Sequence, residues 1–170
     1  MQGVWCLVGS ISNKVGKGFE KDFRNSCPKD VLIFRLKDGK GVGKNPCDYI
    51  VYKYPHMYML ELKTVQGKSL PFVNIKPHQL ESMNKVWEVY GMVGGFIINF
   101  RSVNETYFVD GRKMKSFTET TDKKSFPISW VKDNGILLPQ HIKRTRYHYD
   151  YSFMQEVYNY DTITDCRRNI

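Results

Sequence analysis

The fold is decided by residues 48–65, which read DYIVYKYPHMYMLELKTV. Both halves of this stretch are rich in β-branched, aromatic and apolar residues, which favour strands. The run is broken once, at Tyr54-Pro55-His56, where a proline suits a turn. The stretch therefore predicts a hairpin of two antiparallel strands.

Three charged side chains of this hairpin are expected to converge. If the turn is centred between Tyr54 and Pro55, Asp48 lies opposite Glu61, and directly opposed residues project from the same face of a sheet. Lys63 follows Glu61 by two positions and shares that face, because strand side chains alternate. The hairpin thus predicts two carboxylates and one ammonium group in one place.

Carboxylates placed this close repel each other unless a cation lies between them. Carboxylate oxygens are the ligands that Mg²⁺ prefers, and the ion can hold a phosphate oxygen and lower the pKa of a bound water. We therefore expect a magnesium site at Asp48 and Glu61, with Lys63 orienting or deprotonating the water. Without metal, a raised carboxyl pKa or local disorder is expected. The alternative is a solvated ion pair between Lys63 and either carboxylate.

The acid-x-lysine spacing alone is not specific, because DGK at 38–40 and DKK at 122–124 share it. Neither of those matches lies at the end of a predicted apolar strand with an acidic residue before it at the spacing that a hairpin would bring together. Residues 61–63 do, with Asp48 as the preceding acid. The surrounding pattern therefore carries the prediction.

A helix and a strand are expected before the hairpin. Asn13 can cap a helix with an apolar side chain at every fourth position, which ends at Cys27-Pro28. Residues 31–34, VLIF, predict a buried strand. A glycine-rich, basic loop follows at 37–44.

Further helices and strands are expected after the hairpin. A helix from Pro77 to Gly91 is predicted to have one apolar face, formed by Leu80, Met83, Trp87 and Tyr90. The remaining elements are a second hairpin and short helices, with strands at 96–100 and 106–109 and helices at 112–119 and after Pro127. This order describes a mixed central sheet with helices on its faces, of the α/β or α+β class.

Length and charge favour one domain that binds a polyanion. With 170 residues, 41% of them hydrophobic, we expect a single domain with an N-terminal arm 1–12, a core at about 13–158 and a C-terminal tail 159–170. The 26 Lys and Arg residues against 17 Asp and Glu give a formal net charge of +9, which favours nucleic acid as the partner.

Other protein classes are disfavoured. The four cysteines form no C-x-x-C pair, which fits a reducing, cytoplasmic compartment. The longest apolar stretch, 90–100, contains three glycines and is shorter than the ~20 residues of a membrane span. The glycine-rich loop does not complete a phosphate-binding loop, since Asn45 follows Lys44, so no nucleotide cofactor is expected.

Short blocks along the chain carry a further signal: NKVGKGFE at 13–20, DY at 48–49, ELKT at 61–64, PF at 71–72, HQ at 78–79, GGF at 94–96, NETY at 104–107, SFPI at 125–128 and DY at 150–151. In order and spacing these blocks resemble the RecU family of Holliday junction resolvases. The resemblance covers roughly residues 13–158.

The resemblance implies a restriction-endonuclease-like fold and a homodimer that nicks four-way DNA junctions symmetrically with Mg²⁺ or Mn²⁺. It implies that Asp48 and Glu61 are metal ligands and that Lys63 is the catalytic lysine. Gln79 is similar to the glutamine that supports the site from the following helix. Glu20 resembles the acidic residue contributed by the first helix.

The chain departs from the family at one point. The family inserts a long stalk between its first two core strands, whereas this sequence has only residues 38–46 there. Basic residues before, on and beyond this loop are candidate phosphate contacts: Lys17, Lys37, Lys40, Lys44, Lys68, Lys76, Arg144 and Arg146.

Two alternatives stay open. The missing stalk permits a nuclease of the same fold that cuts flaps, ends or ordinary duplex. A non-catalytic DNA-binding protein of this fold would bind DNA in a salt-sensitive way without cleaving it.

Overall fold

The computed structural model describes residues 16–36 and 45–157. The expected N-terminal arm 1–12, the helix start at Asn13 and the tail 159–170 lie outside these residues. The loop 37–44 lies outside them as well, and with it the candidate phosphate contacts Lys37, Lys40 and Lys44.

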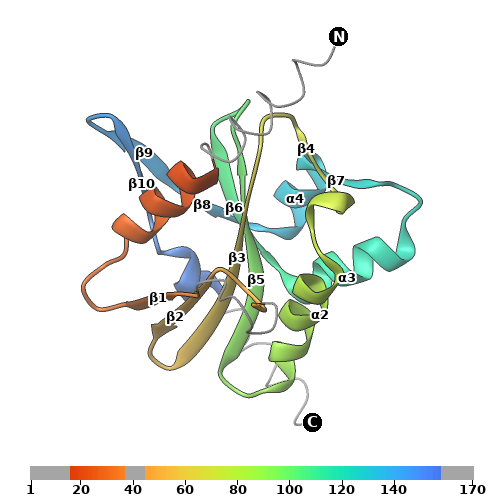
Figure 1. The fold of residues 1–170 in the computed structure, drawn as a ribbon, viewed down its shortest axis with the longest axis horizontal. Helices are drawn as coiled ribbons and strands as arrows, with labels where there is room; N and C mark the ends of the chain where they lie inside the picture. Colours follow the sequence, from red (N-terminus) through yellow and green to blue (C-terminus); the bar gives the residue numbers. More distant parts are fainter. Residues whose placement is uncertain (1–15, 37–44, 158–170) are drawn as a thin grey trace.

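A six-stranded mixed sheet forms the centre of the molecule (Figure 1). Its strands, in spatial order, are β1 (Leu32–Arg35), β2 (Tyr49–Lys53), β3 (His56–Val65), β5 (Met92–Phe100), β6 (Glu105–Asp110) and β8 (Ile136–Leu138). All neighbouring strands are antiparallel except β3 and β5, which are parallel. Parallel neighbours require a crossover, and here it contains a helix.

The two predicted hairpins are present. In β2 and β3, Tyr49 pairs with Leu60 and Lys53 with His56, which is the register expected from a turn at Tyr54-Pro55. In the second hairpin, β5 pairs with β6 through the turn that contains Asn104. As expected, β5 is central, since every residue from its second to its last is buried.

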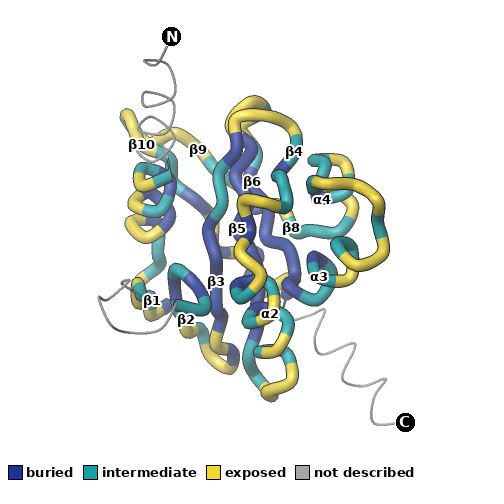
Figure 2. The backbone as a smooth tube through the Cα atoms, turned by 45° about the vertical axis from the view of Figure 1, so that its right-hand side comes forward, coloured by how far each residue is buried: buried dark blue, intermediate teal, exposed yellow. Residues whose placement is uncertain are grey.

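Helices cover both faces of the sheet (Figures 1 and 2). A helix at 16–25 and a short one at 153–157 lie on one face. The other face is covered by α2 (Pro77–Lys85), α3 (Gly111–Thr120) and α4 (Ile128–Asn134). Because strand residues alternate, Leu60 and Leu62 pack into the first layer while Phe96 and Ile98 pack into the second.

Two small ribbons complete the fold, and the sequence did not predict them. The first pairs β4 (Ser69–Pro71) with β7 (Ser125–Pro127), and the second pairs β9 (Gln140–Lys143) with β10 (Arg146–Tyr149). Short 3-10 helices lie at Phe72–Asn74 and Val86–Glu88. No helix in the described ranges is long and apolar enough to cross a membrane.

The helix expected up to Gly91 ends earlier. It stops at Lys85, the chain tightens into the 3-10 helix, and Tyr90 is 91% exposed rather than part of an apolar face. The indole N–H of Trp87 donates to the carbonyl of Gly94 at 2.8 Å, so this end of the segment is drawn toward the start of β5. Gly91 forms the turn with a φ of +76°, a conformation that favours glycine.

The expectation of a buried strand at 31–34 is wrong. Val31 is buried, but Leu32 is 56% and Phe34 59% exposed in β1. β1 is an edge strand. α2 lies on the same face of the sheet as these two side chains, but it contacts β3 and β5, so the face of β1 stays uncovered by this helix.

Gly94 sets how closely α2 approaches β5. A Cβ atom at this position would overlap the backbone carbonyl of Met83 and Cγ2 of Val86. Gly94→Ala is therefore expected to lower the free energy of unfolding by about 1–3 kcal/mol through overpacking. Gly67→Ala is the control, because its Cβ meets nothing within 4 Å. Urea denaturation measures both variants, and equal stability would contradict the close approach.

Candidate active site

Glu61 and Lys63 lie on the face of β3 that α2 covers. The carboxyl side chain of Glu61 is only 4% exposed and that of Lys63 16%. Lys63 Nζ donates to Glu61 Oε1 at 2.9 Å. Leu62, between them, packs into the opposite layer, as the alternation of a strand requires.

Gln79, in the first turn of α2, holds these two groups together. Its Nε2 donates to Glu61 Oε1 at 2.5 Å, and its Oε1 accepts from Lys63 Nζ at 3.2 Å and from the backbone N–H of Lys76 at 3.0 Å. This orientation of the amide is self-consistent, because the oxygen faces two donors and the nitrogen faces a carboxylate. The side chain links the start of α2 to β3.

Asp48 precedes β2 and reaches across to β3. Its backbone N–H donates to the carbonyl of Leu60 at 3.1 Å, which extends the hairpin register by one position. Its Oδ2 accepts from the backbone N–H of Leu62 at 2.8 Å. Asp48 and Glu61 therefore lie on neighbouring strands at the same level of the sheet, as the hairpin pattern predicted.

Glu20 approaches the site from the helix at 16–25. Arg35, the last residue of β1, donates to Glu20 Oε2 at 2.6 Å. The hydroxyl of Tyr49 donates to the backbone carbonyl of Glu20 at 3.2 Å and ties the helix to β2. Arg35 is a site residue that the sequence analysis missed, since an arginine at the end of a strand carries no specific signal.

The electrostatics of the site are those of crowded carboxylates. Burial and the charge of Asp48 raise the pKa of Glu61 to about 7, although Lys63 opposes the shift. Burial and Asp48 also raise the pKa of Glu20, against the effect of Arg35. A raised carboxyl pKa was expected for the metal-free site. The alternative of a solvated ion pair is wrong, because Glu61 is 3% exposed.

The donor set fits a hard divalent cation. Mg²⁺ binds through oxygen, keeps several waters and commonly uses one or two carboxylates, so the chemistry of Asp48 and Glu61 fits this ion. Within residues 16–36 and 45–157, no three His, Cys, Asp or Glu side chains are grouped closely enough to form a ready metal cluster. Glu20 is near enough to feel Asp48 but is held by Arg35.

The candidate phosphate contacts within the described ranges fall into two groups. Lys76 and Lys17 lie beside the site, since their charges lower the pKa of Glu61 and Glu20 respectively. Lys68 is exposed in the turn before β4. Arg144 and Arg146 are exposed on the ribbon of β9 and β10.

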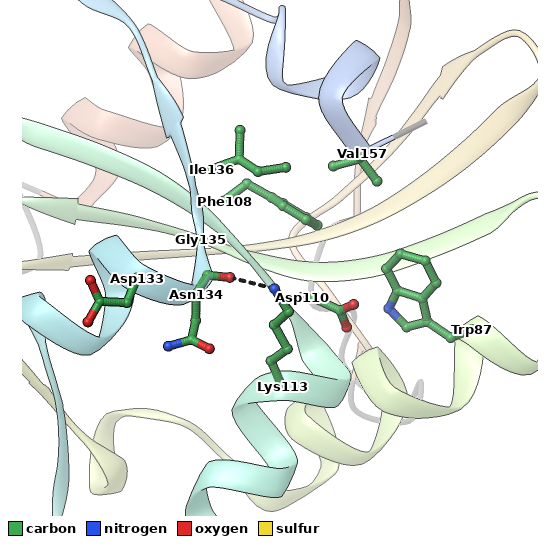
Figure 3. Close-up of a pocket in the computed structure, with 9 residues that line it drawn as sticks. All are labelled: Trp87, Phe108, Asp110, Lys113, Asp133, Asn134, Gly135, Ile136 and Val157. Carbon is green, nitrogen blue, oxygen red and sulfur yellow. Dashed lines mark hydrogen bonds between the residues drawn. The ribbon is translucent and has the colours of Figure 1, made fainter. Parts of the chain in front are cut away.

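A separate cavity of about 110 Å³ contains none of the candidate site residues (Figure 3). It is lined by Trp87, Phe108, Asp110, Lys113, Asp133, Asn134, Gly135, Ile136 and Val157. Its main charged groups bind protein atoms, since Asp110 accepts from Arg112 and Lys113 donates to the carbonyl of Asn134. It offers no grouping of carboxylates like that around Glu61.

Comparison with known proteins assigns the family. The family model described as "RecU: Recombination protein U" matches residues 35–152. The chain belongs to the RecU family. The match includes four of the five candidate site residues, Asp48, Glu61, Lys63 and Gln79, while Glu20 precedes it. The resemblance of the short sequence blocks to RecU is confirmed.

Individual relatives include two proteins named RecU. The chain is 26% identical over 162 residues to the SPbeta prophage-derived uncharacterized protein YotM of Bacillus subtilis, covering 81% of this chain and 83% of that one. It is 28% identical over 97 residues to the Holliday junction resolvase RecU of Oceanobacillus iheyensis, and 31% over 94 residues to that of Streptococcus gordonii. These two matches cover 55% and 54% of this chain, and 49% and 46% of the relatives' lengths.

A solved structure confirms the expected nuclease fold of this RecU protein. The chain is similar to Archaeoglobus fulgidus Hjc, a Holliday junction resolvase, with a TM-score of 0.52 and 16% identity. The likeness covers 72% of this chain and 95% of that one. The mixed sheet flanked by helices is thus of the restriction-endonuclease-like kind.

The raised pKa of Glu61 predicts a pH effect on stability. Its pKa rises from 4.5 to about 7 on folding, so only the folded state holds this proton between those values. Metal-free protein should therefore lose up to about 1.4 kcal/mol per pH unit from this group as pH rises through the window. Below 4.5 and above 7 the contribution should be constant.

The measurement is urea denaturation in EDTA at pH values from 4.5 to 8. Glu61→Gln should remove this pH-dependent loss, because an amide does not titrate. Glu119→Gln, at an exposed position on α3, should follow the wild type. A Glu61→Gln variant with the wild-type pH dependence would disprove the assignment.

Proposed function

We propose that this RecU-family protein is a metal-dependent endonuclease that makes paired nicks in four-way DNA junctions during recombination and repair. The observation that carries the proposal is the partly buried constellation of Asp48, Glu61, Lys63 and Gln79 on one hairpin and the helix that follows it. The family membership and the Holliday junction resolvases among the relatives support the same activity.

Asp48 and Glu61 would hold Mg²⁺ or Mn²⁺, with Glu20 as a further ligand once it leaves Arg35. A bound ion supplies charge neutralisation at the phosphate and acidifies a coordinated water. The crowding that raises the pKa of Glu61 favours cation binding, because a cation relieves the repulsion from Asp48.

Lys63 is the proposed catalytic lysine. Its ammonium group lies 2.9 Å from Glu61 and is largely shielded from solvent, so it can donate to a phosphate oxygen or to the attacking water in a place of low dielectric. Gln79 acts as a positioning residue, since it bonds both Glu61 and Lys63 and comes from a different element. Lys17 and Lys76, beside the carboxylates, are suited to the flanking phosphates.

The short connection between β1 and β2 keeps a second candidate open. Only residues 36–48 separate these strands, where the family stalk would be inserted. A nuclease without the stalk could act on flaps, ends or ordinary duplex with the same catalytic residues. The substrate must therefore be compared directly with a linear control.

The first test uses a labelled mobile four-way junction and a matched linear duplex in Mg²⁺ or Mn²⁺. We expect paired nicks at the junction that EDTA abolishes, and a rate reduced roughly 10²- to 10⁴-fold in Lys63→Ala. Lys85→Ala, at an exposed lysine in the last turn of α2, should keep the wild-type rate.

Equal cutting of both DNAs would replace the resolvase with a general nuclease. Salt-sensitive binding without cleavage in any divalent metal would instead support the non-catalytic alternative.

Paired nicking requires two active sites, and an exposed apolar surface suits a second copy of this chain. Leu32, Phe34, Tyr52 and Met57 are exposed on β1, β2 and β3, and their register places them on the same face of the sheet as Glu61. Contact between two such surfaces would bury apolar area between the two copies.

A charge placed in this surface tests the dimer. Phe34→Glu is expected to weaken association at least about 100-fold, because a carboxylate would be buried against apolar groups. Leu137→Glu is the matched control, since Leu137 is 49% exposed on β8, at the opposite edge of the sheet. Analytical ultracentrifugation measures whether the wild type and each variant have the mass of a monomer or of a dimer. Dissociation by Leu137→Glu alone would move the interface to the other edge.

A further inference from the structure

The ribbon of β9 and β10 has two chemically different faces. His141 lies directly opposite His148, and Lys143 lies opposite Arg146. Because side chains alternate along a strand, these four residues share one face, which we call the basic face. Residues 140–149 include no Asp or Glu, so the ribbon carries positive charge only.

The other face of the ribbon is fixed to the body of the protein. Tyr149 is buried, packs edge-on against Phe19 at 5.4 Å between ring centroids, and donates its backbone N–H to Ser26 Oγ at 3.0 Å. Tyr147 also packs against this core. The ribbon is therefore anchored through its tyrosines to the helix at 16–25, the same helix that carries Glu20.

A chain of polar side chains connects the ribbon to the catalytic strand. Thr64, next to Lys63, donates to Asn99 at 3.3 Å, and Asn99 donates to Thr106 at 2.7 Å. Thr106 donates in turn to Gln140, the first residue of β9, at 2.5 Å. Asn99 and Thr106 are buried, and a buried, satisfied network of this kind fixes the relative position of the strands that it joins.

The basic face points away from this anchoring side. His141, Lys143 and Arg146 are exposed, and the imidazoles of His141 and His148 lie 5.1 Å apart. Arg146 approaches Asp22 at 3.5 Å and is partly neutralised. Lys143 and Arg144 form no ion pair with any residue in the described ranges. Figure 1 shows the ribbon on the opposite side of the molecule from α3 and β7.

Arg144, in the turn of the ribbon, has a φ of +61°. Glycine and asparagine occupy this left-handed region readily, whereas other residues are strained there. A strained residue at an exposed turn is a reason to look for a function of its side chain. The side chain of Arg144 extends the cationic surface beyond Lys143.

We propose that the ribbon is a second DNA contact, which binds the phosphate backbone of a duplex arm some way from the cleavage site. The inference rests on the proposed function in that the partner is DNA. The ribbon adds a rigid DNA contact to the active site. Its distance from Lys63 is set by the hydrogen bonds that run from Thr64 to Gln140. Lys143 and Arg144, which form no ion pair within the described ranges, are suited to bind phosphates with little sequence preference.

The test compares two variants that each lose two positive charges. Lys143→Gln with Arg144→Gly alters the ribbon, and Lys123→Gln with Lys124→Gln alters an exposed stretch just before β7. Fluorescence anisotropy in EDTA measures the affinity of each full-length protein for the junction and for a linear duplex over a range of salt concentrations.

The ribbon variant should bind both DNAs about tenfold more weakly. The slope of its log affinity against log salt concentration should be smaller in magnitude by about 2. The affinity of the control variant should change by less than about twofold. The thermal midpoint of the ribbon variant should equal or exceed that of the wild type, because glycine relieves the strained turn. A thermal midpoint at or above that of the wild type would exclude misfolding as the cause of the weaker DNA binding.

Two outcomes would overturn the proposal: unchanged affinity and salt slope in the ribbon variant, or no DNA binding by the wild type. Cleavage separates the proposal from the proposed function. A wild type that binds through the ribbon but cuts no DNA would disprove only the proposed nuclease.

Discussion

The buried carboxylate of Glu61 is the constraint on which the site depends. A carboxyl group that is 3% exposed is costly unless it is protonated, paired or bound to a cation. The chain supplies the ammonium of Lys63 two residues away and the amide of Gln79 from α2. The nearby charge of Asp48 works against this pairing. Lys63 and Gln79 thus hold the Glu61 carboxylate in place against the repulsion from Asp48.

The position of α2 follows from this constraint. Gln79 reaches β3 because the first turn of α2 lies over that strand, and at the other end of the helix Gly94 lets Met83 and Val86 approach β5 because it has no side chain. The helix is also the crossover that parallel β3 and β5 require. One helix therefore connects the two central strands and completes the site.

The sequence predicted the parts of the fold that repeat a strong local pattern. The register of β2 and β3 followed from alternation and one proline, and it placed Asp48 beside Glu61 without any knowledge of the family. The role of Gln79 was implied only by the resemblance, because a contact over 16 residues has no local signal. The ribbon was missed because its four-residue strands are short and have exposed polar faces.

The arrangement of charge separates binding from catalysis. The carboxylates of Asp48, Glu61 and Glu20 repel a phosphate, so contact with the DNA backbone requires the cationic residues around them. The net charge of +9 is consistent with that requirement. Lys17 and Lys76 lie at the border of the carboxylates, and the basic ribbon lies further away on a fixed support. A backbone held at both places would be positioned before the metal engages the phosphate, because the distance between them is set by buried hydrogen bonds.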